Sequence, residues 1–140
     1  MAKILVIEDN PTNMKLTCFL LDNLGHKVFT AIDAETGIAI ARNERPQLIL
    51  MDIQLPGMNG LAATALLKKD SSTAHIPIIA VTALAMKIDQ EKSLMAGCDD
   101  YIAKPLRYKE LHAVINKYLM QNKNSSLIDI HKKGNIYDTG

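Results

Sequence analysis

Residues 48–60 read LILMDIQLPGMNG, an apolar run that ends at an acidic residue and then leads into a turn. Polar and apolar residues do not alternate along Leu48–Met51, a pattern typical of a strand buried on both faces of a parallel sheet. Asp52 follows this run directly, and the Asn59-Gly60 pair farther on is a turn signal. The stretch therefore predicts a central strand with a carboxylate at its carboxyl end.

Three other apolar runs resemble this one, and a further run is weaker. The weaker run, His26–Thr30, is shorter and more polar, so we expect it at an edge of the sheet. The other runs are rich in β-branched residues, which favour strands. They cover Ile4–Ile7, Ile76–Val81 and, less clearly, Tyr101–Ala103.

Helix-like segments separate these runs. After Pro11, apolar residues recur at intervals of three and four as far as a helix stop at Gly25. Strand and helix alternate five times, which predicts a doubly wound α/β domain with a five-stranded parallel sheet. We expect the flavodoxin-like strand order 2-1-3-4-5, with five flanking helices. Beyond the first helix, the expected helices lie around Ala34–Ala41, over Leu61–Lys69, over Met86–Ala96 and around Leu111–Tyr118.

Composition bounds the possible partners. The chain has 140 residues, enough for one domain, and a formal net charge of +1 with no basic run, so we expect no nucleic-acid partner. It shows no signal-peptide pattern and no apolar stretch of membrane-spanning length, so we expect no membrane partner and a cytoplasmic location.

We expect the domain to cover residues 1–121. Residues 122–140, rich in Asn, Ser, Lys and Gly, are expected to be a C-terminal tail or linker.

Chemically active side chains follow four of the predicted strands. Glu8 and Asp9 follow the first strand, Asp52 the third, Thr82 the fourth and Lys104 the fifth. Taken one at a time, these residues are ordinary helix caps, turn residues or a surface lysine. However, the carboxyl ends of parallel strands meet at one edge of the sheet, where ligands bind in open α/β folds. We therefore expect these five side chains to converge.

Three carboxylates in one place repel one another unless a cation lies among them. Oxygen ligands without His or Cys suit Mg²⁺ and suit zinc poorly. An ammonium and a hydroxyl beside an acceptor carboxylate and Mg²⁺ are the groups that phosphoryl transfer requires, because that reaction depends on positioning and charge neutralisation. The pattern therefore indicates a phosphoryl-accepting site.

Four motifs at these positions resemble the receiver domain of two-component response regulators. They are VIEDN at residues 6–10, LILMDIQLPGMNG at 48–60, VTA at 81–83 and YIAKP at 101–105. The resemblance runs from about residue 2 to residue 121. The wording of the motifs is most similar to single-domain regulators of the DivK type or to receivers attached to hybrid sensor kinases.

The resemblance implies that Asp52 accepts a phosphoryl group from a histidine kinase or a histidine phosphotransfer protein. It also implies that Mg²⁺ is bound by the side chains of Glu8, Asp9 and Asp52 and by the backbone carbonyl of Gln54. The protein would then be a phosphorylation-dependent signalling switch. It would promote its own phosphorylation and dephosphorylation without being a dedicated enzyme, and would be a monomer or weak dimer.

The resemblance further implies roles around the phosphoryl group. Lys104 would pair with its oxygens, through a cis peptide bond to Pro105. Thr82 would donate a hydrogen bond to it, and Tyr101 would turn inward in concert. The face built from the fourth helix, the fifth strand and the fifth helix would change its affinity for a downstream protein partner.

Other functions remain open at this point. The chain could be the receiver fragment of a larger hybrid kinase or regulator, or a pseudo-receiver that only binds partners. An aspartyl-nucleophile phosphatase would need a general acid two residues beyond Asp52, where Gln54 stands. A flavodoxin-like nucleotide-binding protein would need a phosphate-cradling loop after the first strand, where the chain has Glu8 and Asp9 instead.

Overall fold

The computed structural model describes residues 2–83 and 87–120, and its centre is a five-stranded sheet. The strands are β1 (Lys3–Ile7), β2 (Lys27–Ala31), β3 (Leu48–Asp52), β4 (Ile78–Thr82) and β5 (Asp100–Ala103). Every neighbouring pair is parallel, and the order is β2-β1-β3-β4-β5. The predicted strand order is therefore confirmed, and the weakest predicted strand lies at an edge.

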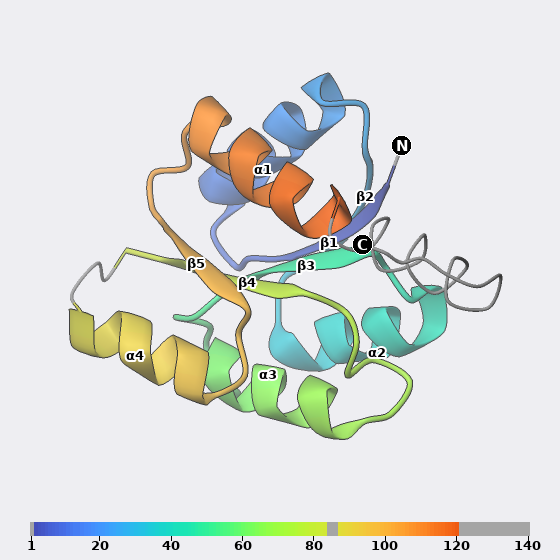
Figure 1. Cartoon of the computed structure of the whole chain (residues 1–140), viewed down its shortest axis with the longest axis vertical. Helices are drawn as coiled ribbons and strands as arrows, with labels where there is room; N and C mark the ends of the chain where they lie inside the picture. The colour runs from blue at the N-terminus through green and yellow to red at the C-terminus, as the bar shows by residue number, and fades with distance from the viewer. Residues whose placement is uncertain (1, 84–86, 121–140) are drawn as a thin grey trace, which may run out of the picture.

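Helices cover both faces of this sheet, as predicted. They are α1 (Pro11–Asn23), α2 (Ala34–Glu44), α3 (Gly60–Lys69), α4 (Lys87–Met95) and a C-terminal helix whose described part is residues 108–120. Figure 1 shows α1 and the C-terminal helix on one face and α2, α3 and α4 on the other. Among the described residues, these helices lack the combination of length and apolar character that crossing a bilayer requires.

The sheet separates two apolar cores. Leu5 and Ile7 of β1 point into the core under α2 and α3, whereas Ile4 and Val6 point into the core under α1 and the C-terminal helix. Successive side chains of a strand face opposite sides of a sheet, so a strand covered on both sides must be apolar throughout. This explains the absence of alternation in the central runs.

Several helices begin directly after the strand ends. The side chains of Asn10, Asp33 and Asn59 each accept a hydrogen bond from the backbone amide three residues farther on. Such N-caps satisfy amides that have no partner within the helix. They fix α1, α2 and α3 against the carboxyl edge of the sheet, where the predicted site lies.

The strand boundaries lie within one residue of the predicted ones, except at the start of the fourth strand. The fourth strand was expected from Ile76, but β4 begins at Ile78 because Pro77 has no amide hydrogen to donate to the sheet. Its carbonyl still accepts a hydrogen bond from Ile49 N at 2.9 Å. The expected start of the fourth helix at Met86 and the expected tail at residues 122–140 lie outside the described residues.

The turn between α4 and β5 is anchored from the α3 side by Lys68. Its Nζ donates hydrogen bonds to the carbonyls of Ala74 (3.2 Å) and Ile76 (2.8 Å) and to Asp99 Oδ2 (3.0 Å). The same Asp99 oxygen accepts a hydrogen bond from Ile78 N at 2.8 Å. One lysine therefore joins α3, the segment before β4 and the start of β5.

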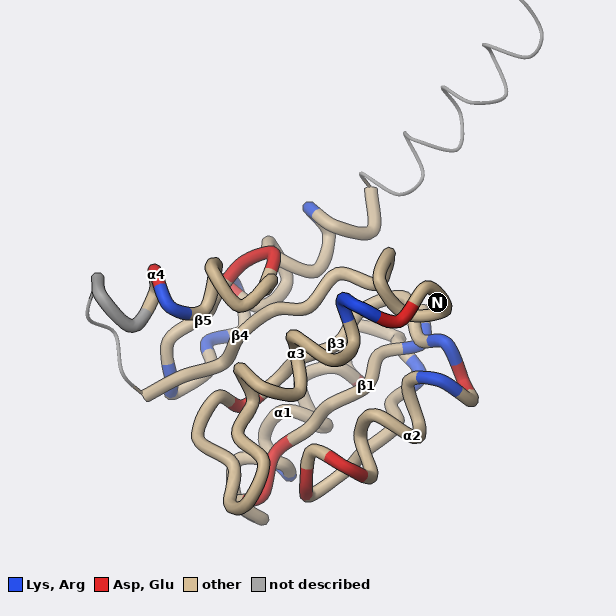
Figure 2. Tube along the Cα trace, turned by 90° about the horizontal axis from the view of Figure 1, so that it is seen from below, with Lys and Arg blue, Asp and Glu red and all other residues tan. Residues whose placement is uncertain are grey.

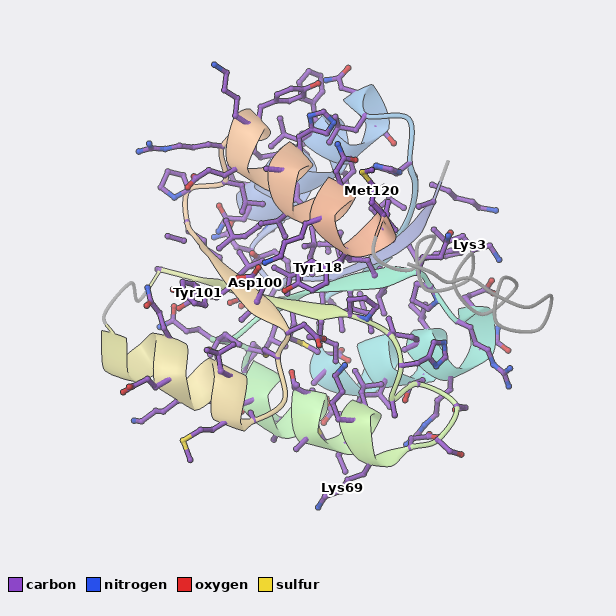
Figure 3. The ribbon with its side chains drawn as sticks, viewed as in Figure 1. Lys3, Lys69, Asp100, Tyr101, Tyr118 and Met120 are labelled. Carbon is purple, nitrogen blue, oxygen red and sulfur yellow. The ribbon has the colours of Figure 1, made fainter. Side chains whose placement is uncertain are left out.

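Tyr118 anchors the same turn from the C-terminal helix. Its hydroxyl donates to the Asp99 carbonyl (2.8 Å) and to Asp100 Oδ2 (3.2 Å), and Figure 3 shows its side chain beside Asp100. Burial and the neighbouring Asp100 carboxylate raise the pKa of Tyr118 to about 12. The start of β5 is thus held from both sides of the sheet.

Lys68→Met retains the methylene packing and removes the ammonium. We expect it to lower the free energy of unfolding by about 2–3 kcal/mol, because two carbonyls and a carboxylate lose a charged donor. Lys69→Met is the matched control, since Lys69 is an exposed neighbour, and should change stability by less than about 0.5 kcal/mol. Urea unfolding measures both values, and equal losses would contradict the anchoring role.

Tyr118→Phe is expected to destabilise the protein by about 1 kcal/mol at neutral pH, through the lost hydrogen bonds. A pKa raised in the folded state means that the unfolded chain releases the proton first, so the unchanged protein loses stability as pH rises from about 10 to about 12. The variant is spared this loss. Chemical unfolding should therefore show that the difference in free energy of unfolding between the unchanged protein and Tyr118→Phe shrinks over that pH range. A constant difference would refute the raised pKa of Tyr118.

Candidate functional site

Three carboxylates meet at the carboxyl edge of the sheet. Glu8 and Asp9 follow β1, and Asp52 is the last residue of β3. One carboxylate oxygen of each lies within 4.8 Å of the others. In Figure 2 acidic residues, in red, gather where β1 ends and where α2 begins. The convergence predicted for these three side chains is therefore observed.

Lys104 lies among these acids. It follows β5, and its Nζ is 3.0 Å from Glu8 Oε1 and 3.2 Å from Asp52 Oδ2. Burial by itself would lower the pKa of Lys104, but the hydrogen bond to Glu8 and the charge of Asp52 outweigh it and raise that pKa. The ammonium of Lys104 thus lies between two carboxylates that favour its charged form.

Glu8 and Asp9 differ in their surroundings. Glu8 is 4% exposed, and its Oε2 accepts a hydrogen bond from Asn10 N at 3.1 Å, whereas Asp9 is exposed. Burial, supported by a hydrogen bond with Asp52, raises the pKa of the Glu8 carboxyl. Glu8 is therefore the inner acid of the pair, and Asp9 is the one that solvent and ligands reach first.

The backbone after β3 holds the Asp52 carboxylate. Asp52 is 2% exposed, and its Oδ1 accepts a hydrogen bond from Gln54 N at 2.9 Å. Ile53 N donates to the carbonyl of Val81 at 3.1 Å, which ties this loop to β4. One oxygen of the carboxylate therefore accepts a hydrogen bond from the loop backbone, and the other forms an ion pair with Lys104.

The remaining predicted residues come from β4 and β5. Thr82 is the last residue of β4 and is buried, and its carbonyl accepts a hydrogen bond from Lys104 N at 2.8 Å. The bond between Lys104 and Pro105 is cis, the isomer that the family resemblance implies. Tyr101 lies on β5, half-buried against the core under α2 and α3. The inward turn of the Tyr101 side chain on phosphorylation stays a prediction.

The acids present fit a magnesium ion. Three carboxylates against one ammonium leave an excess of two formal negative charges, which a divalent cation would neutralise. Mg²⁺ binds proteins through a few carboxylates and keeps several waters, so it needs a ligand that solvent reaches, such as Asp9. The side chains of Glu8, Asp9 and Asp52 would hold it here.

Sequence reasoning missed one residue of this site. The Asn59-Gly60 pair predicts a turn, but Asn59 caps α3 and Gly60 is the first residue of that helix. Gly60 is buried against the backbone of Asp52. An Asn followed by a helix-like run is itself an N-cap signal, whereas the close approach to Asp52 depends on tertiary packing.

Comparison with known proteins identifies the class. A sequence model described as the response regulator receiver domain matches residues 4–116. The chain therefore belongs to the response regulator receiver domain family, whose members are phosphorylation-dependent signalling switches. Receiver domains work with histidine kinases or phosphotransfer proteins and act on downstream partners.

Two curated relatives show the range of contexts. The polar-differentiation response regulator DivK of Brucella anthropi is 43% identical over 116 residues, covering 83% of this chain and 94% of that protein. The hybrid signal transduction histidine kinase G of Dictyostelium discoideum is 45% identical over 119 residues, covering 83% of this chain. The chain spans only 4% of that kinase.

A solved structure gives a similar picture. The receiver domain of a sensor histidine kinase from Pseudomonas aeruginosa PAO1 is 36% identical and superimposes with a TM-score of 0.79. The match covers 84% of this chain and 96% of that one. In that crystal structure a magnesium ion is coordinated in the active-site cleft.

Lys104→Met tests the electrostatics of the site. It leaves three carboxylates without their ammonium, so we expect the metal-free protein to lose about 3 kcal/mol of stability at neutral pH. Added Mg²⁺ should restore more stability to the variant than to the unchanged chain, because the variant lacks the competing cation. Urea unfolding with chelator and with Mg²⁺ measures this. Lys15→Met, at an exposed position on α1, is the control; equal stabilisation of both variants by Mg²⁺ would contradict the account.

Proposed function

We propose that Asp52 accepts a phosphoryl group from a phosphohistidine of a histidine kinase or histidine phosphotransfer protein. The supporting observation is the Asp52 carboxylate, 2% exposed at the end of a central strand and 3.2 Å from Lys104 Nζ. In the step, an Asp52 oxygen bonds to phosphorus while the P–N bond breaks. The imidazole nitrogen keeps the electron pair of that bond and takes up a proton. The product is an acyl phosphate on Asp52.

Lys104 and the neighbouring acids would share the charge of this reaction. Lys104 is close to both Glu8 and Asp52, and its ammonium would pair with phosphoryl oxygens as they arrive. The side chains of Glu8, Asp9 and Asp52, with the backbone carbonyl of Gln54, would hold Mg²⁺. When bound, Mg²⁺ neutralises negative charge on the carboxylates and phosphoryl oxygens. The loop that follows β3 would hold the Asp52 carboxylate in position for the reaction.

The response to phosphorylation would pass through Thr82 and Tyr101. An acyl phosphate adds negative charge and acceptor oxygens, and the Thr82 hydroxyl would donate a hydrogen bond to one of them. Tyr101 would turn inward in concert and so alter the face formed by α4, β5 and the C-terminal helix. Exposed apolar side chains on α4 would supply contact area to such a partner, since Met95 is 87% exposed and Leu94 is 48% exposed. A change in this face between two states would change its affinity for a partner.

The proposal also covers the kind of protein in which this site works, its location and its oligomeric state. The chain would act as a switch that promotes its own phosphorylation and dephosphorylation, not as a dedicated enzyme, and would work in the cytoplasm. Residues 1–121 would form the receiver domain, and residues 122–140 a tail or a linker within a longer protein. The domain would be a monomer or a weak dimer. The match to a hybrid kinase supports the version in which it is part of a longer protein.

Phosphoramidate tests the acceptor directly, because its P–N bond resembles that of phosphohistidine. In the presence of Mg²⁺, intact-protein mass spectrometry should find the mass of one added phosphoryl group on the unchanged chain. Asp52→Asn should remove at least nine-tenths of this signal, and a chelator should do the same. Asp22→Asn, at an exposed position on α1, is the matched control and should be labelled normally. Labelling that persists in Asp52→Asn would overturn the proposal.

A further inference from the structure

The first residue of α3 is packed directly against the backbone of the acceptor residue. A Cβ atom added to Gly60 would overlap the carbonyl oxygen of Asp52 and would lie 2.8 Å from Ile53 Cα and 3.0 Å from the Asp52 carbonyl carbon. These neighbours are backbone atoms, which cannot rotate away as the end of a side chain can. A larger residue at position 60 must therefore displace either α3 or the loop that follows β3.

Hydrogen bonds hold this close approach in place. Gly60 N donates to the carbonyl of Ile53 at 3.1 Å, and the carbonyl of Gly60 accepts from Thr64 Oγ1 at 2.8 Å. The Asn59 side chain caps the helix one residue earlier. The first turn of α3 is thus fixed both to the loop and to its own helix. Displacement at position 60 would reach the loop.

The same loop sets the direction of the Asp52 carboxylate. Asp52 Oδ1 accepts its hydrogen bond from Gln54 N, two residues farther along this loop, and Ile53 N is bonded to β4. A shift of the backbone at residues 52–53 therefore rotates the carboxylate relative to Lys104. It also moves the backbone of Gln54, the next residue of the same loop.

We propose that Gly60 is a positioning residue for the acceptor: its lack of a side chain lets α3 rest on the Asp52 backbone and so orients the Asp52 carboxylate and the Gln54 backbone toward the metal position. This inference rests on the proposed role of Asp52. Gly60 itself touches neither the phosphoryl group nor the metal. Its effect on both is exerted through the backbone of residues 52–54.

Two other glycines have different requirements and provide controls. Gly57 lies in the same loop with a φ of +71°, and a Cβ there would meet nothing within 4 Å. Gly57 is needed for its backbone conformation and not for space. Gly37 of α2 lies against the side chain of Ile7 and not against backbone atoms. Alanine therefore tests a different effect at each position. It strains the backbone at position 57, crowds a side chain at position 37 and crowds backbone atoms at position 60.

The test compares Gly60→Ala with Gly57→Ala and Gly37→Ala. In metal-free protein, Gly60→Ala should shift the backbone amide NMR resonances of Ile53 and Gln54, whereas Gly37→Ala should leave them in place. Titration with Mg²⁺ should show at least tenfold weaker binding for Gly60→Ala, because a displacement of about 1 Å suffices to spoil a site. Gly37→Ala should change the affinity less than twofold, and Gly57→Ala, which strains the same loop without crowding the Asp52 backbone, should cause a smaller loss than Gly60→Ala. Thermal unfolding of all three variants corrects for lost stability.

Two results would overturn the proposal. The first is Gly60→Ala with Mg²⁺ affinity within twofold of Gly37→Ala at comparable stability. If Gly60→Ala does not fold, hydrogen exchange of the Gly60 amide in the unchanged chain decides instead. Positioning predicts that Mg²⁺ slows this exchange at least tenfold, and an unchanged rate is the second contrary result. These readouts involve no phosphorylation, so failure of Asp52 as the acceptor would appear separately, in the labelling of Asp52→Asn.

Discussion

Mutual repulsion among Glu8, Asp9 and Asp52 is the constraint on which this molecule depends. Their oxygens lie within 4.8 Å of one another, and two of the acids are almost fully buried. Such a group destabilises a fold unless cations balance it, and Lys104 supplies one positive charge between Glu8 and Asp52. The remaining negative charge makes the site ready for a divalent cation. It is then suited to a reaction in which a phosphoryl group joins one of the acids.

The parallel sheet is what brings these groups together and holds them there. The four strands that carry the site residues end at the same edge, so residues far apart in sequence become neighbours there. Two apolar cores keep the strands in register, and Lys68 and Tyr118 fasten the start of β5 from opposite sides. The rigid frame supports a site whose loops and helix starts remain close to solvent. The fold therefore supplies precise placement, and the loops supply the chemistry.

The sequence predicts most of this fold, because buried strands and amphipathic helices have distinct periodicities. It also predicts the edge at which Glu8, Asp9, Asp52 and Lys104 meet, since strand ends in a parallel sheet share that edge. It does not predict that Lys104 bridges Glu8 and Asp52 specifically, which depends on side-chain geometry. The contact of Gly60 with the Asp52 backbone is missed as well, because helix packing distance carries no local sequence pattern. The strand boundary at Ile78 follows from Pro77, which is itself a signal in the sequence.

The central claim is that the acceptor is the carboxylate of Asp52 and no other group. Borohydride reduces an acyl phosphate of aspartate to homoserine, so it marks the residue that carried the phosphoryl group. After treatment of the unchanged chain with phosphoramidate and Mg²⁺, followed by borohydride, peptide mass spectrometry should find homoserine at position 52. Reduction at Glu8 or Asp9, or a phosphoryl group retained on a histidine with position 52 unmodified, would contradict the account.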